Sequence, residues 1–159
     1  TIAVWDAHTG ELKHTLEGHT GKVFALTFSP DGTWLISGSE DTTARIWDLV
    51  TGEVLQRLEG HGGKVTSVAL SPRYKIIATG CQDKLIRIWN AKKGELLVTL
   101  PGHSRAVSSV AFSRSGKTLV SGSFDHTIKS WDMRKGRCLR TLEGHQGAVL
   151  ALIKDGELV

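Results

Sequence analysis

The sequence predicts an all-β protein built from a four-stranded unit that repeats every 42 residues. Three markers keep that period: a Gly-His dipeptide, a Trp-Asp dipeptide that once becomes Trp-Asn, and a turn glycine. They occur at Gly18-His19, Gly60-His61, Gly102-His103 and Gly144-His145, at Trp5-Asp6, Trp47-Asp48, Trp89-Asn90 and Trp131-Asp132, and at Gly10, Gly52, Gly94 and Gly136. Because three independent markers stay in register along the chain, the repeat sets the architecture.

Each unit contains four segments with the composition of β-strands. In the first complete unit they are residues 22–29, 33–39, 44–48 and 53–60, which are rich in β-branched and aromatic side chains. Turn signals separate them, among them Pro-Asp-Gly at 30–32. Four short antiparallel strands in 42 residues, with no helical window, predict one blade of a β-propeller.

The first strand of this unit has a break in its alternation. Its large apolar residues are Val23, Leu26 and Phe28, spaced by three and then by two positions. A regular strand presents every second residue to the same face. The spacing therefore predicts a β-bulge between Val23 and Leu26.

The two ends of the chain read as parts of a fourth, atypical unit. Residues 147–153 have the pattern of a strand, 154–157 that of a tight turn, and 158–159 that of the start of another strand. Aligned to the third unit, the ends are in phase with about six residues missing between them. We favour a stretch of a longer array; the alternative is that two copies join in a ring of about eight blades.

The prediction is thus a single propeller segment of about four blades, with the fourth blade split between the two termini. Its blades span approximately 1–17 (partial), 18–59, 60–101, 102–143 and 144–159 (partial).

These units resemble WD40 repeats over essentially the whole chain. The resemblance rests on the period, on the Gly-His and Trp-Asp dipeptides, and on the segments FSPDG (28–32) and SGSED (37–41). It implies a hydrogen-bonded tetrad in each blade, which would satisfy a buried carboxylate and make the blade rigid. The matching residues are His19, Ser37, Asp41 and Trp47; His61, Thr79, Asp83 and Trp89; His103, Ser121, Asp125 and Trp131; and, split between the termini, His145 and Trp5.

Composition and motifs favour a non-catalytic protein without a metal or cofactor. The 159 residues carry a formal charge of +4, and no apolar run approaches the ~20 residues of a membrane span. Cys81 and Cys138 show no metal or redox spacing, and Cys81 is expected to be a small buried filler. The periodic histidines lie in different blades, too far apart to share one ion. We find no nucleophile elbow, phosphate-binding loop or zinc motif, and therefore expect no enzyme activity, cofactor or metal site.

The resemblance also implies a binding surface on the narrow top face of the propeller. In the family, docking positions lie three and five residues after the Gly-His histidine and one before the tetrad Asp. Carried over, they are Lys22, Phe24, Glu40, Lys64, Thr66, Gln82, Ala106, Ser108, Phe124 and Leu150. Phe24, Phe124 and Leu150 would be large apolar groups on an exposed rim, which is typical of interfaces. The simpler alternative is that these side chains only cap the blade ends.

Turns on the opposite face predict a second candidate surface, a basic patch. In the second and third complete units they hold nine of the twenty basic residues: Arg73, Lys75, Lys92, Lys93, Arg114, Lys117, Arg134, Lys135 and Arg137. The equivalent turns of the first unit carry Asp31, Asp48 and Glu53. Such a patch could hold nucleic-acid phosphates, anionic lipid or an acidic protein, or only keep the protein soluble.

We therefore expect an intracellular, non-catalytic scaffold that presents a rigid surface to partner proteins or peptides within a larger complex. The remaining blades of a longer chain, or a second copy, would close its ring. The alternative is a phosphate-recognising module for RNA, DNA or anionic lipid that uses the basic turns. The two hypotheses differ in salt dependence, which is steep for phosphate contacts.

Overall fold

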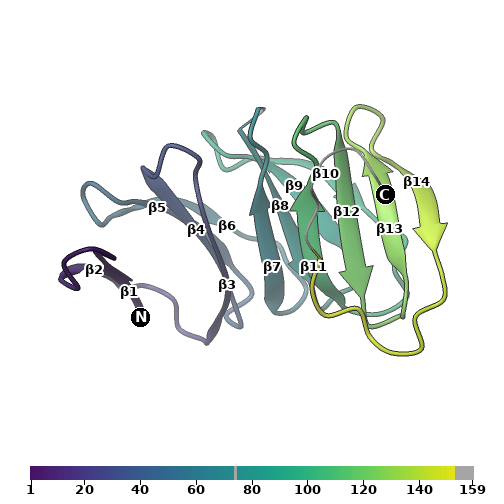
Figure 1. The fold of residues 1–159 in the computed structure, drawn as a ribbon, viewed down its shortest axis with the longest axis horizontal. Coiled ribbons are helices and arrows are strands. Elements are labelled where there is room, and N and C mark those ends of the chain that lie inside the picture. The colour runs from purple at the N-terminus through teal and green to yellow at the C-terminus, as the bar shows by residue number, and fades with distance from the viewer. Residues whose placement is uncertain (74, 153–159) are drawn as a thin grey trace.

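The structure, a computed structural model, describes residues 1–73 and 75–152 as a row of antiparallel β-sheets (Figure 1). Three sheets have four strands each, and a two-stranded sheet stands at the N-terminal end of the row. The described residues contain no helix that is long and apolar enough to cross a membrane. The predicted all-β class, with units of four antiparallel strands, is confirmed.

The strands follow the repeat. The two-stranded sheet pairs β1 (Ile2–Trp5) with β2 (Leu12–Leu16). Blade 1 contains β3 (Val23–Phe28), β4 (Trp34–Ser39), β5 (Ala44–Asp48) and β6 (Val54–Leu58). Blade 2 contains β7 (Val65–Leu70), β8 (Ile76–Cys81), β9 (Ile86–Asn90) and β10 (Leu96–Leu100). Blade 3 contains β11 (Val107–Phe112), β12 (Thr118–Ser123), β13 (Ile128–Asp132) and β14 (Arg137–Leu142). Consecutive strands are neighbours in every blade, so each is a β-meander.

The inner strand of blade 1 contains the bulge predicted from its apolar spacing. Its register against β4 shifts between Val23 and Ala25. The inner strands β7 and β11 show the same shift, between Val65 and Ser67 and between Val107 and Ser109. A bulge adds one residue to one strand and re-aims the side chains beside it. Phe24 lies at this point in blade 1, and half of its surface is exposed.

Neighbouring blades pack face to face through apolar side chains. Ile36 and Leu58 of blade 1 share a buried cluster with Val65 and Val68 of blade 2. Gly38 in β4 permits this close approach, because a Cβ there would lie 2.7 Å from Val65 Cγ1. A second cluster joins blades 2 and 3 through Ala78, Ile86, Ile88, Leu100, Val107, Val110, Phe112, Leu119 and Trp131. A third joins the two-stranded sheet to blade 1 through Ile2, Leu16, Leu35 and Trp47.

The N-terminal strands and the last described residues lie at opposite ends of the row. The sheet of β1 and β2 stands beside blade 1, whereas residues 147–152 lie against blade 3 (Figure 1). There the Val149 amide donates to the carbonyl of Ser123 at 3.1 Å. Among the described residues, the two parts of the expected fourth blade therefore do not come together. The reason is that each blade packs only on its neighbours, so the three complete blades separate residues 1–16 from residues 147–152.

The expectation of a strand at residues 147–153 is wrong in its described part, because residues 147–152 form no strand. Single hydrogen bonds hold them to β11: Ser108 Oγ donates to the Val149 carbonyl, and the Leu152 amide donates to Ser109 Oγ at 3.1 Å. An inner strand needs the ladder of a second strand of its own blade, and no described residue supplies one here. The turn expected at 154–157 and the strand expected at 158–159 lie outside the described residues.

Candidate functional site

Blade 1 contains a complete tetrad. His19 Nδ1 lies 2.7 Å from Asp41 Oδ2, and His19 Nε2 lies 2.7 Å from Ser37 Oγ. The indole N–H of Trp47 donates to Ser37 Oγ at 2.8 Å. Burial opposes ionisation of Asp41, but hydrogen bonds from Thr43 and His19 hold its pKa well below the ordinary value. Burial also lowers the pKa of His19, so the ring is neutral at pH 7 and donates to a charged carboxylate.

Blade 3 repeats this geometry. His103 lies 2.8 Å from Asp125 Oδ2 and 2.7 Å from Ser121 Oγ, and Trp131 donates to the same hydroxyl at 2.8 Å. Thr127 Oγ1 donates to the second carboxylate oxygen of Asp125 at 2.6 Å, as Thr43 does in blade 1. Such connected polar groups stabilise the top-face loops in one arrangement.

Blade 2 departs from the expected tetrad. Its His61 and Trp89 both reach Thr79 Oγ1, at 2.8 and 2.9 Å, but His61 Nδ1 donates to the Thr42 carbonyl of blade 1 at 3.1 Å. Asp83 instead lies beside Arg87, whose Nη1 is 2.8 Å from Asp83 Oδ2. The expected His61–Asp83 contact is therefore absent among the described hydrogen bonds. Burial and the nearby Arg87 charge lower the pKa of His61 to about 4.

The sequence carries a signal for this difference. Blades 1 and 3 have a threonine two residues after the tetrad aspartate, Thr43 and Thr127, and its hydroxyl holds one carboxylate oxygen. Blade 2 has Leu85 at that position, which cannot donate such a bond. With that partner missing, Asp83 forms an ion pair with the buried Arg87.

The split fourth tetrad is also not assembled. Trp5 is 60% exposed and His145 is exposed, and they belong to opposite ends of the row. Neither makes a tetrad hydrogen bond among the described residues. The cause is that the three complete blades lie between the two residues.

Cys81 takes the place of a serine in the other blades. It is fully buried, and its Sγ lies 3.3 Å from the Gly63 carbonyl. Burial raises the pKa of the Cys81 thiol to about 11. The equivalent Ser39 and Ser123 each accept a hydrogen bond from the amide of the tetrad Asp, as Cys81 does from Asp83. Its role is therefore that of a turn-stabilising side chain with an inert thiol.

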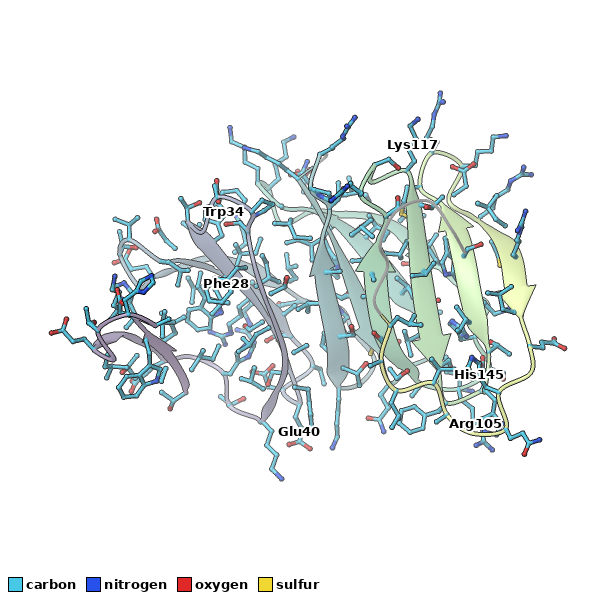
Figure 2. All side chains as sticks on the ribbon, viewed as in Figure 1. Phe28, Trp34, Glu40, Arg105, Lys117 and His145 are labelled. Carbon is cyan, nitrogen blue, oxygen red and sulfur yellow. The ribbon has the colours of Figure 1, made fainter. Side chains whose placement is uncertain are left out.

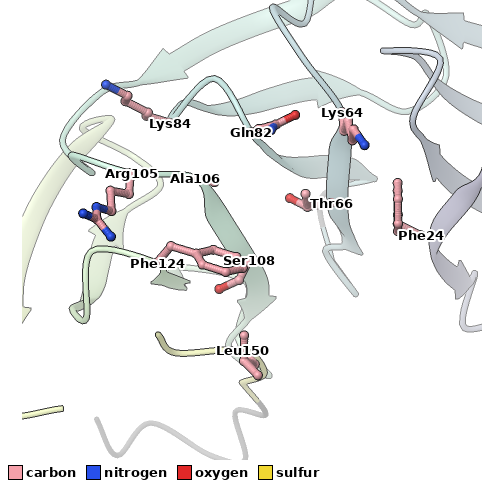
Figure 3. Close-up of a pocket in the computed structure, with 10 residues that line it drawn as sticks. All are labelled: Phe24, Lys64, Thr66, Gln82, Lys84, Arg105, Ala106, Ser108, Phe124 and Leu150. Atoms are coloured by element: carbon pink, nitrogen blue, oxygen red, sulfur yellow. The ribbon is translucent and has the colours of Figure 1, made fainter. Parts of the chain in front are cut away.

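Eight of the ten predicted top-face residues line one groove across blades 1 to 3 (Figure 3). The groove has a volume of about 720 Å³. Its lining residues are Phe24, Lys64, Thr66, Gln82, Lys84, Arg105, Ala106, Ser108, Phe124 and Leu150. We call it the top groove. Predicted positions Lys22 and Glu40 do not line it.

Two aromatic rings mark the sides of the top groove. Phe24 is 50% exposed and Phe124 is 42% exposed, and Figure 3 shows them on opposite sides with Thr66 between them. Lys64 Nζ lies 5.7 Å from the centre of the Phe24 ring and also pairs with Glu40 across the blade boundary. This arrangement offers apolar anchors beside a cation, which suits a protein segment.

Sequence reasoning missed two cations of the top groove, Lys84 and Arg105. Lys84 stands one residue after the tetrad Asp83, and Arg105 stands two residues after His103. Neither occupies one of the docking positions that the family resemblance implies. Only the folded turns bring them beside the aromatic side chains.

The basic patch lies on the opposite face. Figure 2 shows Lys117 at one edge of the sheets and Glu40, Arg105 and His145 at the other. All nine residues of the patch are exposed. Within it, Lys93 lies 3.7 Å from Glu95, and Lys75 lies 5.9 Å from the centre of the Trp34 ring.

The described residues hold no cluster of three or more His, Cys, Asp or Glu side chains that could bind a metal ion. The tetrad histidines of blades 1 to 3 are each hydrogen-bonded within or between blades, and the tetrad carboxylates have partners of their own. The ordered polar side chains of this face therefore hold the blades in place, and the groove beside them is the candidate site.

A family model confirms the class of the protein. Residues 10–48, 52–90 and 94–132 each match the model described as "WD domain, G-beta repeat". These segments cover more than half of the chain, so the chain belongs to this family. WD40 proteins generally act as interaction scaffolds, and no catalytic family is indicated.

Solved structures show the same fold. The chain is similar to those titled "Structure of U3-55K" and "Crystal structure of RRP9 WD40 repeats", each with a TM-score of 0.84 and 35% sequence identity. The match covers 89% of this chain and 44% of each of those chains.

Curated relatives match over single repeats. They include a periodic tryptophan protein 2 homolog of Neurospora crassa (50% identical over 44 residues) and nuclear distribution protein PAC1 of Arthroderma benhamiae (47% over 45 residues). A third is eukaryotic translation initiation factor 3 subunit I of Culex quinquefasciatus (40% over 45 residues). Each match spans 28% of this chain and 5%, 10% and 14% of the respective relative.

Proposed function

We propose that this chain is a non-catalytic scaffold that binds partner proteins through the top groove, inside a cell and within a larger complex. The observation that carries the proposal is the groove itself, which brings together eight predicted docking positions around Phe24 and Phe124. Its volume of about 720 Å³ lies in the range of binding pockets, ~300–1,000 Å³.

The mechanism is rigid presentation. The tetrads of blades 1 and 3 and the blade-to-blade bond of His61 hold the loops on which the groove is built. A partner segment then meets side chains that are already in place, which lowers the entropy lost on binding. Phe24 and Phe124 act as apolar anchors, and Lys64, Lys84 and Arg105 orient acidic groups of the partner.

The test is a quantitative pull-down with the wild-type chain and the Phe24→Ala and Phe124→Ala variants, followed by titration of a captured protein in purified form. We expect each variant to lose its affinity by about tenfold or more, since exposed aromatic anchors carry much of an interface's energy. Leu139→Ala is the matched control, because Leu139 is exposed on β14 and lies outside the groove. Unchanged affinity in both aromatic variants would remove the top groove as the site.

The competing hypothesis is phosphate recognition by the basic patch. All nine cations are exposed on one face, which supports contact with RNA, DNA or anionic lipid. Replacing Lys92, Lys93, Arg134 and Lys135 by Glu would abolish retention on RNA or anionic vesicles under that hypothesis, and retention would fall steeply with salt. Under the scaffold proposal the same variant keeps its affinity for the protein captured by the top groove.

A further inference from the structure

A second groove lies between blades 2 and 3, on the side of the basic patch. It has a volume of about 470 Å³ and is lined by Ile76, Ile88, Leu97, Val98, Gly116, Lys117, Met133 and Arg134. Strands β8, β9 and β10 supply the apolar floor, and the turns that follow β11 and β13 supply the rim. We call it the junction groove. Lys117, on its rim, marks its face in Figure 2, opposite the face of Arg105 in the top groove.

Its chemistry combines an apolar floor with a cationic rim. Leu97 is 52% exposed and belongs to none of the three buried clusters, and Val98 and Met133 are only partly buried against the cluster between blades 2 and 3. Lys117 and Arg134 are exposed, and neither side chain has an ion pair among the described residues. A partner that supplies apolar groups and negative charge would satisfy both features.

The equivalent position between blades 1 and 2 carries different side chains. Trp34 replaces Ile76, and Lys75 lies over its ring at 5.9 Å. Gln56 replaces Val98, and its amide donates to the Lys92 carbonyl across the blade boundary at 3.2 Å. The repeat can therefore accommodate larger or polar side chains at both positions. Blade 2 has smaller apolar ones, which leave the hollow open.

We infer that the junction groove binds an acidic amphipathic segment of a partner protein. Apolar side chains of that segment enter the hollow beside Leu97 and Met133, and its carboxylates pair with Lys117 and Arg134. Nucleic-acid phosphates would contact the rim and leave the apolar floor unused. A membrane surface fits less well, because the two flanking turns, 113–117 and 133–136, carry no exposed large apolar side chain that could insert into lipid.

The test uses the full 159-residue chain and fluorescence anisotropy. The probe is a fluorescein-labelled synthetic peptide with leucine and glutamate on opposite faces of a helical pattern. Controls are the same peptide with serine for leucine, a labelled single-stranded RNA of the same length, and vesicles of anionic lipid. We expect binding of the leucine–glutamate peptide, and at least about tenfold weaker binding of the serine version.

Variants assign the binding to this groove. Val98→Gln and Ile76→Trp introduce the side chains that blade 1 has at the equivalent positions, so the fold can accept them. Each should weaken binding of the peptide by about tenfold. Lys117→Glu, at an exposed position, should do the same. Lys22→Glu, and the Phe24→Ala and Phe124→Ala variants of the top groove, should leave the affinity unchanged.

Several results would overturn the inference. These are equal binding of the leucine and serine peptides, binding that survives both Val98→Gln and Lys117→Glu, and retention of RNA or vesicles without retention of the peptide. Because Phe24 and Phe124 lie outside the junction groove, the outcome here is separate from that of the top groove.

Discussion

The junction between blades 2 and 3 and the junction between blades 1 and 2 are held by different hydrogen bonds. At the first, two adjacent hydroxyl residues of β7 reach blade 3. Thr66 Oγ1 donates to the Val107 carbonyl, and Ser67 Oγ accepts from the Val110 amide at 3.0 Å. Residues 108 and 109 of β11 make the same two bonds to residues 149 and 152.

At the junction of blades 1 and 2 the equivalent residues of β3 are Phe24 and Ala25, which have no hydroxyl group. Two side chains of blade 2 reach back to blade 1 instead. His61 donates to the Thr42 carbonyl at 3.1 Å, and Lys64 pairs with Glu40. The 42-residue repeat therefore preserves the packing of blades, whereas the hydrogen bonds between blades differ from one junction to the next. Position 24 carries a phenylalanine in place of a hydroxyl residue, and its ring forms one side of the top groove.

The largest predicted effect concerns the ion pair between Asp83 and Arg87, which replaces the histidine–aspartate contact in blade 2. Asp83→Ala removes the anion beside the nearly buried Arg87 guanidinium, and should lower the free energy of unfolding by about 3–5 kcal/mol. Adding Arg87→Met to this variant should recover much of the lost free energy of unfolding, because no buried charge is then left unpaired. Asp125→Ala in blade 3 is the comparison, and Lys129→Met should not rescue it. Urea denaturation measures the free energy of unfolding of the two single and the two double variants. If Arg87→Met does not rescue Asp83→Ala, the ion pair is contradicted.

The next effect is on pH dependence. The unfolded chain protonates histidine near pH 6.5, whereas His61 in the fold protonates near pH 4. Between pH 6.5 and pH 4 the folded state therefore binds fewer protons than the unfolded chain. The His61 contribution to the free energy of unfolding is thus fully present above pH 6.5 and is lost as the pH falls toward 4. Between pH 7 and pH 5 the His61 contribution amounts to about 2 kcal/mol.

Urea denaturation of His61→Gln at both pH values checks this, since the variant should lack that part of the wild-type change. Burial also lowers the pKa of His103, but the hydrogen bond to Asp125 opposes this shift, so His103→Gln should lose less pH dependence. Equal pH profiles for the two variants would contradict the difference between blades 2 and 3.

The smallest effect tests the exchange at position 24. Phe24→Thr supplies the hydroxyl that Thr66 has in blade 2, and should raise the free energy of unfolding by about 1 kcal/mol. Thr66→Val should lower it by a similar amount. The same Phe24→Thr change should weaken partner binding in the top groove. Thermal and urea denaturation measure the change in stability, and titration of the captured partner measures the change in affinity. A variant that is more stable and also binds the partner more tightly would contradict this prediction.

Much of the fold could be predicted from the sequence because its determinants are local. The apolar alternation, the Pro-Asp-Gly turn and the spacing of Val23 and Leu26 specify strands, hairpins and a bulge within one unit. The arrangement of side chains across blades could not be predicted in the same way. Asp83 stands at a tetrad position, yet it pairs with Arg87, and His61 bonds to the Thr42 carbonyl instead. Lys84 and Arg105 join the top groove only because two turns, twenty-one residues apart, meet in the fold.

The all-β class, the repeating four-stranded unit and the tetrads of blades 1 and 3 could be predicted from the sequence alone, since each depends on residue types at fixed spacing within 42 residues. Three features became evident only in the folded chain: residues 1–16 and 147–152 lie at opposite ends of the row, His61 bonds across a blade boundary, and side chains from several blades outline the two grooves. These depend on contacts between neighbouring blades, where a side chain selects among partners that lie close in space and far apart in sequence. A local pattern specifies the strand that carries a side chain, but packing of the next blade determines which partner that side chain reaches.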